Sequence, residues 1–381
     1  MEQHAGIAWD QGLSAWRVTG HAAARRVLAD PHLDVVREST AAHTPLSGEP
    51  TPVEFLGSWF SRSPRDRHLA VKRRLVRVYG PAALEPSRAA MVTLAESLAR
   101  ALPDRCDLVA DYLQPLVLGG VAQLLAVPSS EHPAFGRVVR ALSAILGRPA
   151  LDERALAVTA RCMQYLRAFV ERMRRVPQPP PLVAALRSLG GDDPQASPWP
   201  VAAALAQVLT AGLHPTVTGA AIAWRTLHER PAVRDQLAAG TLALGELVEE
   251  VLRLHPPFPF LRRWAHAPCE CTGVTLAPGD AVVVDVGAVN RDPAVFEHPE
   301  RILGGRARSL GLSFGHGGHR CLGPGLARLQ VTVALRALLD LDRVPRPIAA
   351  SASGGPVEHL LVVSSLPCER EPTSPALRGI A

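Results

Sequence analysis

Three features of this 381-residue sequence predict a mainly α fold with a small β part. Apolar residues recur at helical spacing over most of residues 66–254. After Pro256 the pattern changes to short β-branched runs separated by turns. A glycine-rich stretch at residues 310–325 then precedes one more apolar helix.

Composition supports one folded body. Hydrophobic residues make up 47% of the chain and charged residues 20%, which is ordinary for a globular protein and unlike a disordered one. We find no linker that would divide the chain, so a single domain over residues 1–381 is predicted. It has an α-rich part at about 66–255, and a β-containing part at about 256–381 that includes the N-terminal strands.

The individual elements follow in order. Residues 15–19 read as a strand and residues 20–30 as a short helix. Residues 38–65 carry repeated Pro and Gly with few periodic apolar residues, which predicts a long loop. Helices are predicted over 66–79, 83–101, 107–126, 133–146, 151–175, 200–229 and 243–254.

The last third is more varied. Residues 270–286 predict a hairpin, with Pro278-Gly279-Asp280 as its turn and the run 281–284 as its second strand. A helix is expected over 326–341, and a final strand pair within 354–364.

The charge pattern bears on partners. The net charge is +6, and Lys72 is the only lysine beside many arginines. Nucleic-acid binding is a weak interpretation, because the arginines are spread along the chain and aromatic residues total only 4%. A basic surface can instead steer an acidic protein toward its docking site.

No segment offers the ~18 uninterrupted apolar residues that span a bilayer, and the first residues are polar. A cytoplasmic protein without a membrane anchor is expected. Six scattered cysteines do not indicate a disulfide framework.

The most informative segment is Phe-Gly-His-Gly-Gly-His-Arg-Cys-Leu-Gly at residues 314–323, directly before a predicted helix. Closely spaced glycines allow a tight turn and close approach to a flat ligand. Near a helix N-terminus Cys321 would be stabilised as a thiolate, the form that ligates metals. The plain alternative is a buried structural cysteine beside a glycine-rich turn.

This segment resembles the haem-binding loop of the cytochrome P-450 family, Phe-Gly-x-Gly-x-His-x-Cys-x-Gly, at every specified position. The resemblance implies haem b as cofactor, with Cys321 as the axial thiolate ligand of the iron. It also implies that His319 bonds a haem propionate and that Phe314 packs beside the sulfur. Gly315 and Gly323 match glycines of the motif.

Other segments resemble the same family. Glu250 and Arg253 match its Glu-x-x-Arg helix pair, which implies that Arg301 joins them from a later loop. The plain alternative for the Glu250 and Arg253 pair is an ordinary solvated helix surface.

A second set of matches concerns propionate partners. Arg263 occupies the place of the family's propionate-binding arginine, and its plain alternative is a surface arginine. His68 and Lys72 match a His-x-x-x-Arg pattern, with Lys as a point charge in place of Arg.

The predicted helix over 200–229 departs from the family. Its Ala-Gly-Leu-His-Pro-Thr segment carries Gly212, but His214 replaces the usual acid and Pro215 the first threonine. Pro215 should kink the helix. His214 could relay protons or could merely satisfy carbonyls freed by the kink, and Thr216 is rotated by ~100° from the lost threonine.

The resemblance implies an oxidoreductase that tailors a secondary metabolite by hydroxylation or epoxidation. Because of His214 and Pro215, oxidative coupling and peroxide-driven oxidation stay open, as does a non-catalytic haem-binding protein. The substrate would be a small molecule or a short peptide. Its pocket is expected to be lined by the loop 38–65, by residues 209–216, and by Phe258 and Phe260.

Electrons would come from NAD(P)H through a ferredoxin or flavodoxin. This donor would dock near Lys72, Arg73 and Arg74. We expect a monomer that binds neither nucleic acid nor membrane.

Overall fold

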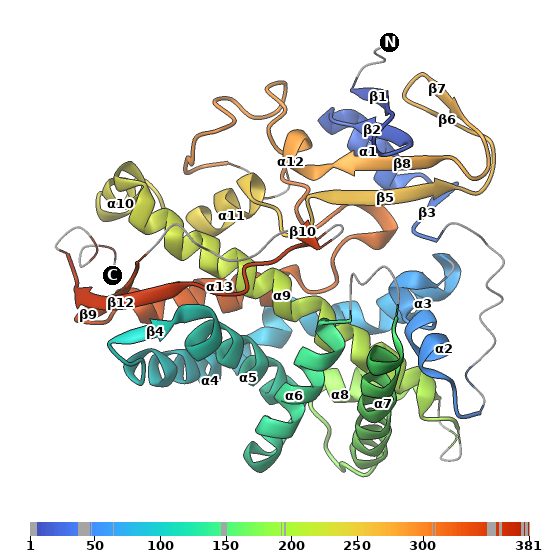
Figure 1. The fold of residues 1–381 in the computed structure, drawn as a ribbon, viewed down its shortest axis with the longest axis horizontal. Helices are drawn as coiled ribbons and strands as arrows, with labels where there is room; N and C mark the ends of the chain where they lie inside the picture. The colour runs from blue at the N-terminus through green and yellow to red at the C-terminus, as the bar shows by residue number, and fades with distance from the viewer. Residues whose placement is uncertain are drawn as a thin grey trace.

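The structure is a computed structural model (Figure 1). It describes residues 6–36, 46, 48–63, 65–145, 151–191, 193, 196–306, 308, 310–348, 356–357, 360–374, 377 and 380. The predicted mainly α fold with a small β part is confirmed.

Helices form most of the described chain. They are α1 (His21–Ala29), α2 (Pro52–Gly57), η1 (Phe60–Arg62), α3 (Arg65–Leu75), η2 (Val76–Tyr79), α4 (Pro81–Arg100), η3 (Val109–Leu113), α5 (Gln114–Leu124), η4 (Ser129–Glu131), α6 (His132–Ser143), α7 (Glu153–Arg174), α8 (Pro181–Arg187), η5 (Ser188–Gly190), α9 (Trp199–Glu229), α10 (Pro231–Ala238), α11 (Leu244–Leu254), α12 (Val286–Val289), η6 (Gly317–His319) and α13 (Pro324–Leu339).

Proline explains many of these helix starts. Helices α2, α4, α5, α6, α8, α9, α10 and α13 all carry proline in their first two positions. Proline is suited to that position because its fixed φ is helical and the missing N–H has no intrahelical partner there. A proline-rich sequence is therefore compatible with a mainly helical protein.

The strands form small sheets. They are β1 (Ile7–Asp10), β2 (Ala15–Val18), β3 (Leu33–Asp34), β4 (Arg105–Asp107), β5 (Phe260–Ala265), β6 (Cys269–Cys271), β7 (Val274–Leu276), β8 (Ala281–Asp285), β9 (Arg343–Pro347), β10 (Pro356–Val357), β11 (Leu360–Leu361) and β12 (Pro367–Pro372). One sheet has the order β1-β2-β8-β5-β3 and another β4-β12-β9; β6-β7 and β10-β11 are two-stranded. Only the β2–β8 pair among them is parallel.

Helix α9 runs through the middle of the molecule, with the five-stranded sheet on one side and α4 to α7 on the other (Figure 1). It packs against α13, α6, α11, α5 and α7. Within the described residues it is the one helix long and apolar enough to cross a membrane, and most of it is buried inside the protein. Its apolar character therefore follows from its central position in the core.

Most predicted helices are confirmed, but the loop predicted over 38–65 is partly wrong. Residues 52–57 form α2 because Thr51 and Glu54 make a capping box around Pro52. Residues 60–62 form a further short helical turn. Within 38–65, residues 38–45, 47 and 64 lie outside the described part of the chain.

The predicted hairpin is also wrong in its pairing. Its turn is at Thr272-Gly273, which joins β6 to β7, and not at Pro278-Gly279-Asp280. The run 281–284 pairs with β5 and β2 instead, because it is buried on both faces in the middle of the larger sheet. The predicted final strand pair is confirmed as β10 and β11, while 354–355 and 358–359 lie outside the described part.

Two half-buried histidines predict how stability depends on pH. Burial, followed by nearby arginines, lowers the pKa of His228 and of His255 from 6.5 to about 4. Below pH 6.5 the unfolded chain takes up protons that the folded chain does not, so stability is lost as pH falls toward 4. We expect a lower urea midpoint at pH 5 than at pH 7.5. The difference should shrink in His228→Gln, and an equal midpoint at both pH values would contradict this reading.

Candidate active site

The glycine-rich segment forms a tight loop before α13. Gly315 and Gly317 have φ values of 69° and 68°, which favour glycine. A Cβ on Gly317 would collide with the backbone of Leu28 at the end of α1, so only glycine fits there. The N–H of Cys321 donates to the carbonyl of Phe314 at 2.7 Å and closes the loop.

The surroundings of Cys321 leave its thiol accessible and at the same time desolvate it. The residue is exposed, yet the surrounding protein desolvates its thiol strongly enough to raise the pKa. The backbone N–H of Gly323 and the charges of Lys72, Arg328 and Arg320 act in the opposite direction. A soft ligand is therefore held accessible in desolvating surroundings, with groups nearby that stabilise its anionic form.

Phe314, at the start of the same loop, is half-buried. The guanidinium carbon of Arg328 sits 4.5 Å from the ring centroid. Arg328 is fixed in turn by hydrogen bonds to both carboxylate oxygens of Glu249 on α11.

An opening is present beside the middle of α9. Ala211 is exposed although the helix around it is mostly buried, and a Cβ built on Gly212 would meet no atom within 4 Å. The helix continues through Pro215, which has no N–H for the carbonyl of Ala211. A small-residue surface and a carbonyl without its usual helical donor therefore border open space.

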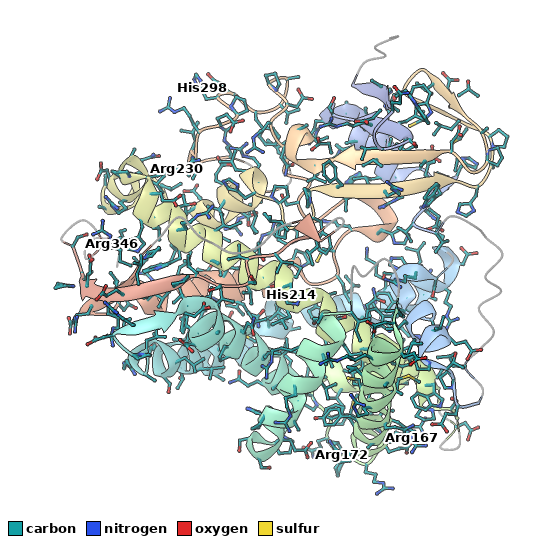
Figure 2. All side chains as sticks on the ribbon, in the orientation of Figure 1. Arg167, Arg172, His214, Arg230, His298 and Arg346 are labelled. Atoms are coloured by element: carbon teal, nitrogen blue, oxygen red, sulfur yellow. The ribbon has the colours of Figure 1, made fainter. Side chains whose placement is uncertain are left out.

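His214 lies on α9 near the centre of the molecule (Figure 2). It is half-buried, and burial lowers its pKa, so the imidazole is neutral near pH 7. A neutral imidazole can both accept and donate a hydrogen bond. Thr216 is buried at 5% exposure.

Three of the sequence-predicted cofactor-site residues gather around the cysteine loop. The rings of His68 and His319 stack with centroids 4.0 Å apart. His68 lies between the carbonyls of Phe60 and Gly318, each at 3.1 Å, and its pKa falls to about 4 because of burial. Lys72 donates to the carbonyls of Gly318 at 2.7 Å and Arg320 at 2.6 Å. Helix α3 therefore clamps the loop that carries Cys321.

Arg263 is a buried guanidinium on β5, with 5% exposure. Burial lowers its pKa to about 10, while Asp34 acts in the opposite direction. The hydrogen bond that the structure gives this side chain goes to the carbonyl of Arg262, and no ion pair is formed with the described residues. Since buried charges are normally paired, Arg263 fits an anionic ligand.

Asp34 was not predicted as a member of this cluster. Its carboxylate lies 3.2 Å from Nε2 of His319, and it is buried at the end of β3. Nothing in its local sequence distinguishes it from another strand-terminal aspartate, so only the tertiary structure identifies it.

Glu250 and Arg253 form the predicted pair, 2.7 Å apart with 3% exposure for each side chain. Arg253 also donates to the carbonyls of Asn290, Pro299 and Arg301. This buried network ties α11 to the loop after α12.

The prediction that the Arg301 side chain completes this network is wrong. Arg306 donates to Glu250 at 3.1 Å instead. Arg301 lies at an exposed turn and contributes only its carbonyl, because the loop folds back to bring residue 306 over α11.

These two arginines make a matched pair of variants. We expect Arg306→Ala to lower the free energy of unfolding by ~1–3 kcal/mol, because it removes a hydrogen bond to a buried carboxylate. Arg301→Ala should change it by less than ~0.5 kcal/mol, as for an ordinary surface position. Urea unfolding of both variants measures this. A larger loss for Arg301→Ala would restore the original prediction.

Asn290 is a further link, for which the sequence predicts only a turn at Asn-Arg-Asp-Pro. Its Oδ1 accepts from the N–H of Leu312 at 2.8 Å, and its Nδ2 donates to the carbonyl of Arg253. The buried network and the start of the cysteine loop are thus joined by one fully buried amide.

Comparisons with known proteins agree with this geometry. The model of the family described as Cytochrome P450 matches residues 243–341. The chain is 31% identical to the mycinamicin IV hydroxylase/epoxidase of Micromonospora griseorubida, over 86% of this chain and 82% of that protein. It is also 31% identical to the erythromycin C-12 hydroxylase of Saccharopolyspora erythraea, with 87% and 83% covered. The crystal structure of CalO2 superposes with a TM-score of 0.82 at 25% identity, covering 97% of this chain and 94% of that one.

This chain belongs to the cytochrome P450 family. It is a haem-dependent oxidoreductase of the monooxygenase type, with haem b as cofactor. It acts on small molecules with electrons from NAD(P)H supplied through redox partners. The family, fold and cofactor predicted from the sequence are confirmed.

Proposed function

We propose that this enzyme hydroxylates or epoxidises a mid-sized, partly hydrophobic secondary metabolite, with Cys321 as the axial ligand of its haem iron. The observation that carries the proposal is the exposed thiol of Cys321 in desolvating surroundings, held on the tight loop of residues 314–323. The mycinamicin and erythromycin hydroxylases support the substrate class.

The described residues fit haem b. A cysteine thiolate is one of the axial ligands that haem iron accepts, and Arg263 and His319 offer cationic or hydrogen-bonding partners for two propionates. Phe314 would pack beside the sulfur, while Gly315 and Gly323 allow the loop to lie close to the ring. Haem bound here supplies the activation of dioxygen.

His68 and Lys72 complete the proposed cofactor site from α3. Both hold the carbonyl of Gly318, so they keep the loop closed around Cys321. We propose that Lys72 also lowers the electrostatic cost of placing propionates nearby, as a point charge without a bidentate fork.

On the opposite side we propose α9 as the wall above the haem, with Gly212 giving space for a bound molecule. His214 would hold and pass a proton through its neutral imidazole, in place of the acid that most relatives carry. Pro215 stands where the family carries a threonine, so the hydroxyl that would continue the proton path is absent. The next hydroxyl along the chain is that of the buried Thr216. Oxidative coupling without oxygen insertion is the second candidate, because it does not need a full proton path to dioxygen.

We further propose a ferredoxin or flavodoxin as electron donor, attracted by Lys72, Arg73 and Arg74 on α3. A short peptide is a second possible substrate class. We propose a cytoplasmic monomer, one domain, that binds neither nucleic acid nor membrane.

The mass of the product tests the reaction. Extracts of the native host with and without the gene are compared by high-resolution mass spectrometry. A product heavier than its accumulated precursor by one oxygen supports hydroxylation or epoxidation. A product lighter by two hydrogens supports coupling or desaturation and overturns the oxygen-insertion proposal, while unchanged extracts contradict both.

His214 can be tested separately on the purified enzyme and its substrate. We expect His214→Phe to lower product formed per NAD(P)H by ~10²-fold, since general acid-base groups contribute about that much. His214→Glu should retain most of the yield, and His214→Glu with Pro215→Thr should match or exceed it. Unchanged yield in His214→Phe would show that His214 only satisfies the helix backbone.

A further inference from the structure

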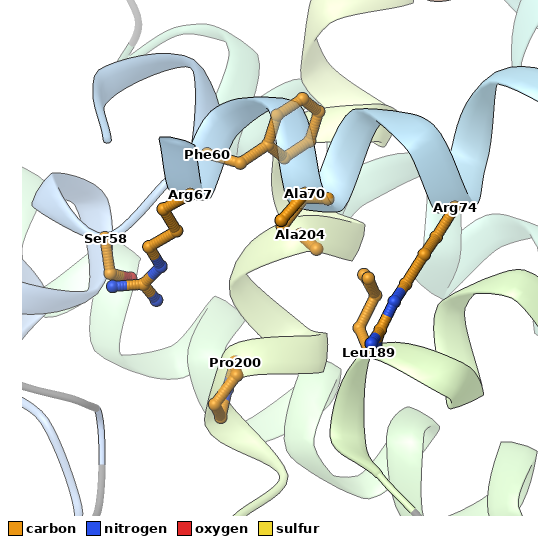
Figure 3. A pocket seen from close by; sticks show the side chains of 9 residues that line it. Ser58, Phe60, Arg67, Ala70, Arg74, Leu189, Pro200 and Ala204 are labelled. Atoms are coloured by element: carbon orange, nitrogen blue, oxygen red, sulfur yellow. The ribbon is translucent and has the colours of Figure 1, made fainter. Parts of the chain in front are cut away.

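A pocket of about 220 Å³ lies between α3, the segment before it and the N-terminal part of α9 (Figure 3). Its lining includes Ser58, Phe60, Arg67, Arg74, Leu189 and Ala204, with further small apolar side chains. At ~30 Å³ per water, it has room for roughly seven waters or a compact organic group.

The pocket is cationic. Arg67 and Arg74 line it, and none of its lining residues is acidic. Figure 3 shows Arg67 beside Ser58 on one side of the pocket and Arg74 beside Leu189 on the other. The guanidinium of Arg74 is tied to the carbonyl of Ser188. The guanidinium of Arg67 makes no ion pair within the described part of the chain, so its N–H groups are available to a ligand.

The hydroxyl of Ser58 is not available to bind an anion, because it donates its hydrogen to the carbonyl of Phe55 at 2.7 Å. The segment before α3 is fixed to α9 as well. The N–H of Ser61 donates to Oε1 of the buried Gln207 at 2.9 Å. The segment that carries Ser58 and Phe60 is therefore held in place before a ligand arrives.

One contact and one shared helix face relate this pocket to the proposed haem site. The ring of Phe60, which lines the pocket, lies 5.8 Å from the ring of His68, the histidine that stacks on His319. Ala204 lies two turns before Ala211 and Gly212 and on the same face of α9, since residues 204, 208, 211 and 212 share that face. From Ala204 to Gly212 the helix rises ~12 Å.

We propose that this pocket binds the carboxylate of the substrate, so that the enzyme acts on organic acids. The carboxylate contacts Arg67, Arg74 adds attraction from the far side, and the apolar body of the molecule runs along the small residues of α9. The carbon to be oxidised then lies roughly 12 Å from the carboxylate. This inference rests on the proposed function, because it assumes that Gly212 borders the reaction site.

Calorimetric binding of decanoate and of methyl decanoate to the haem-loaded enzyme tests the proposal. The two probes have closely similar chains and differ in charge. We expect decanoate to bind about tenfold more tightly, a modest ratio because the arginines are partly exposed. Arg67→Gln should remove the preference, Arg67→Lys should keep most of it, and Arg74→Gln should reduce it in part. Arg77→Gln, on the next turn and outside the pocket, should leave it unchanged.

Equal binding of the two probes to the wild-type enzyme overturns the proposal. A loss of the decanoate preference in Arg67→Gln that is no larger than the loss in Arg77→Gln overturns it as well. Circular dichroism and haem content, expected to be unchanged in every variant, show that each one is folded. The binding measurement needs no electron donor, so a docking role of Arg74 does not affect it. If the anion preference fails while the haem spectrum and the product mass stand, only the pocket assignment is wrong.

Discussion

Cys321→Ser is expected to lower substrate oxidation by at least ~10³-fold, while the protein stays folded. Serine keeps the shape of the side chain but offers no thiolate, and the electron donation that promotes O–O cleavage depends on that thiolate. A loss of three powers of ten corresponds to ~4 kcal/mol in the barrier. Product formation under saturating electron supply measures the effect, and the absorption spectrum reports the changed iron ligand.

The chain offers a matched control in Cys269→Ser. Cys269 is a half-buried cysteine on β6, in the small hairpin outside the cysteine loop. We expect its turnover and spectrum to equal those of the wild type. Full oxidation activity in Cys321→Ser, or an equal loss in both variants, would remove Cys321 from the proposed site.

Glu250→Ala is expected to cost ~3–5 kcal/mol of folding free energy, because it leaves Arg253 buried without its carboxylate partner. Leu303 N–H and Arg306 lose the same acceptor. A typical domain has only ~5–15 kcal/mol to lose, so low yield or lost haem should accompany the change. Urea unfolding and haem content per chain measure it.

Glu300→Ala serves as its control. Glu300 also pairs with an arginine, Arg291 at 2.7 Å, but its side chain is 69% exposed. Exposed pairs contribute ~0–1 kcal/mol, so this variant should resemble the wild type. Similar losses in the two variants would mean that burial of the Glu250 pair does not matter for stability.

Long helices were predictable because their apolar spacing is local information. Helix α9 is an example: both ends agree with the prediction to within one residue. The pairing of the run 281–284 was not predictable, because its partners β2 and β5 are set by tertiary packing and not by the nearest turn. Helix α2 is not predicted, because its Pro and Gly residues indicate a loop, although Thr51 and Glu54 carry a capping signature.

The residues of the candidate site likewise fall into those that the sequence predicts and those that only the structure shows. Cys321 and its glycines could be identified because the whole loop is contiguous in sequence. Arg306 and Asp34 could not, since each meets its partner across many residues and neither has a fixed spacing from it. Arg67 is not predictable either, because an arginine on a basic helix is ordinary until the structure shows a pocket beside it.

The absorption spectrum of the reduced, carbon monoxide-bound wild-type enzyme tests the central claim most directly. Thiolate ligation by Cys321 predicts the red-shifted Soret band from which the family takes its name. A band at the position typical of histidine-ligated haem proteins, or no haem absorbance at all, would contradict it.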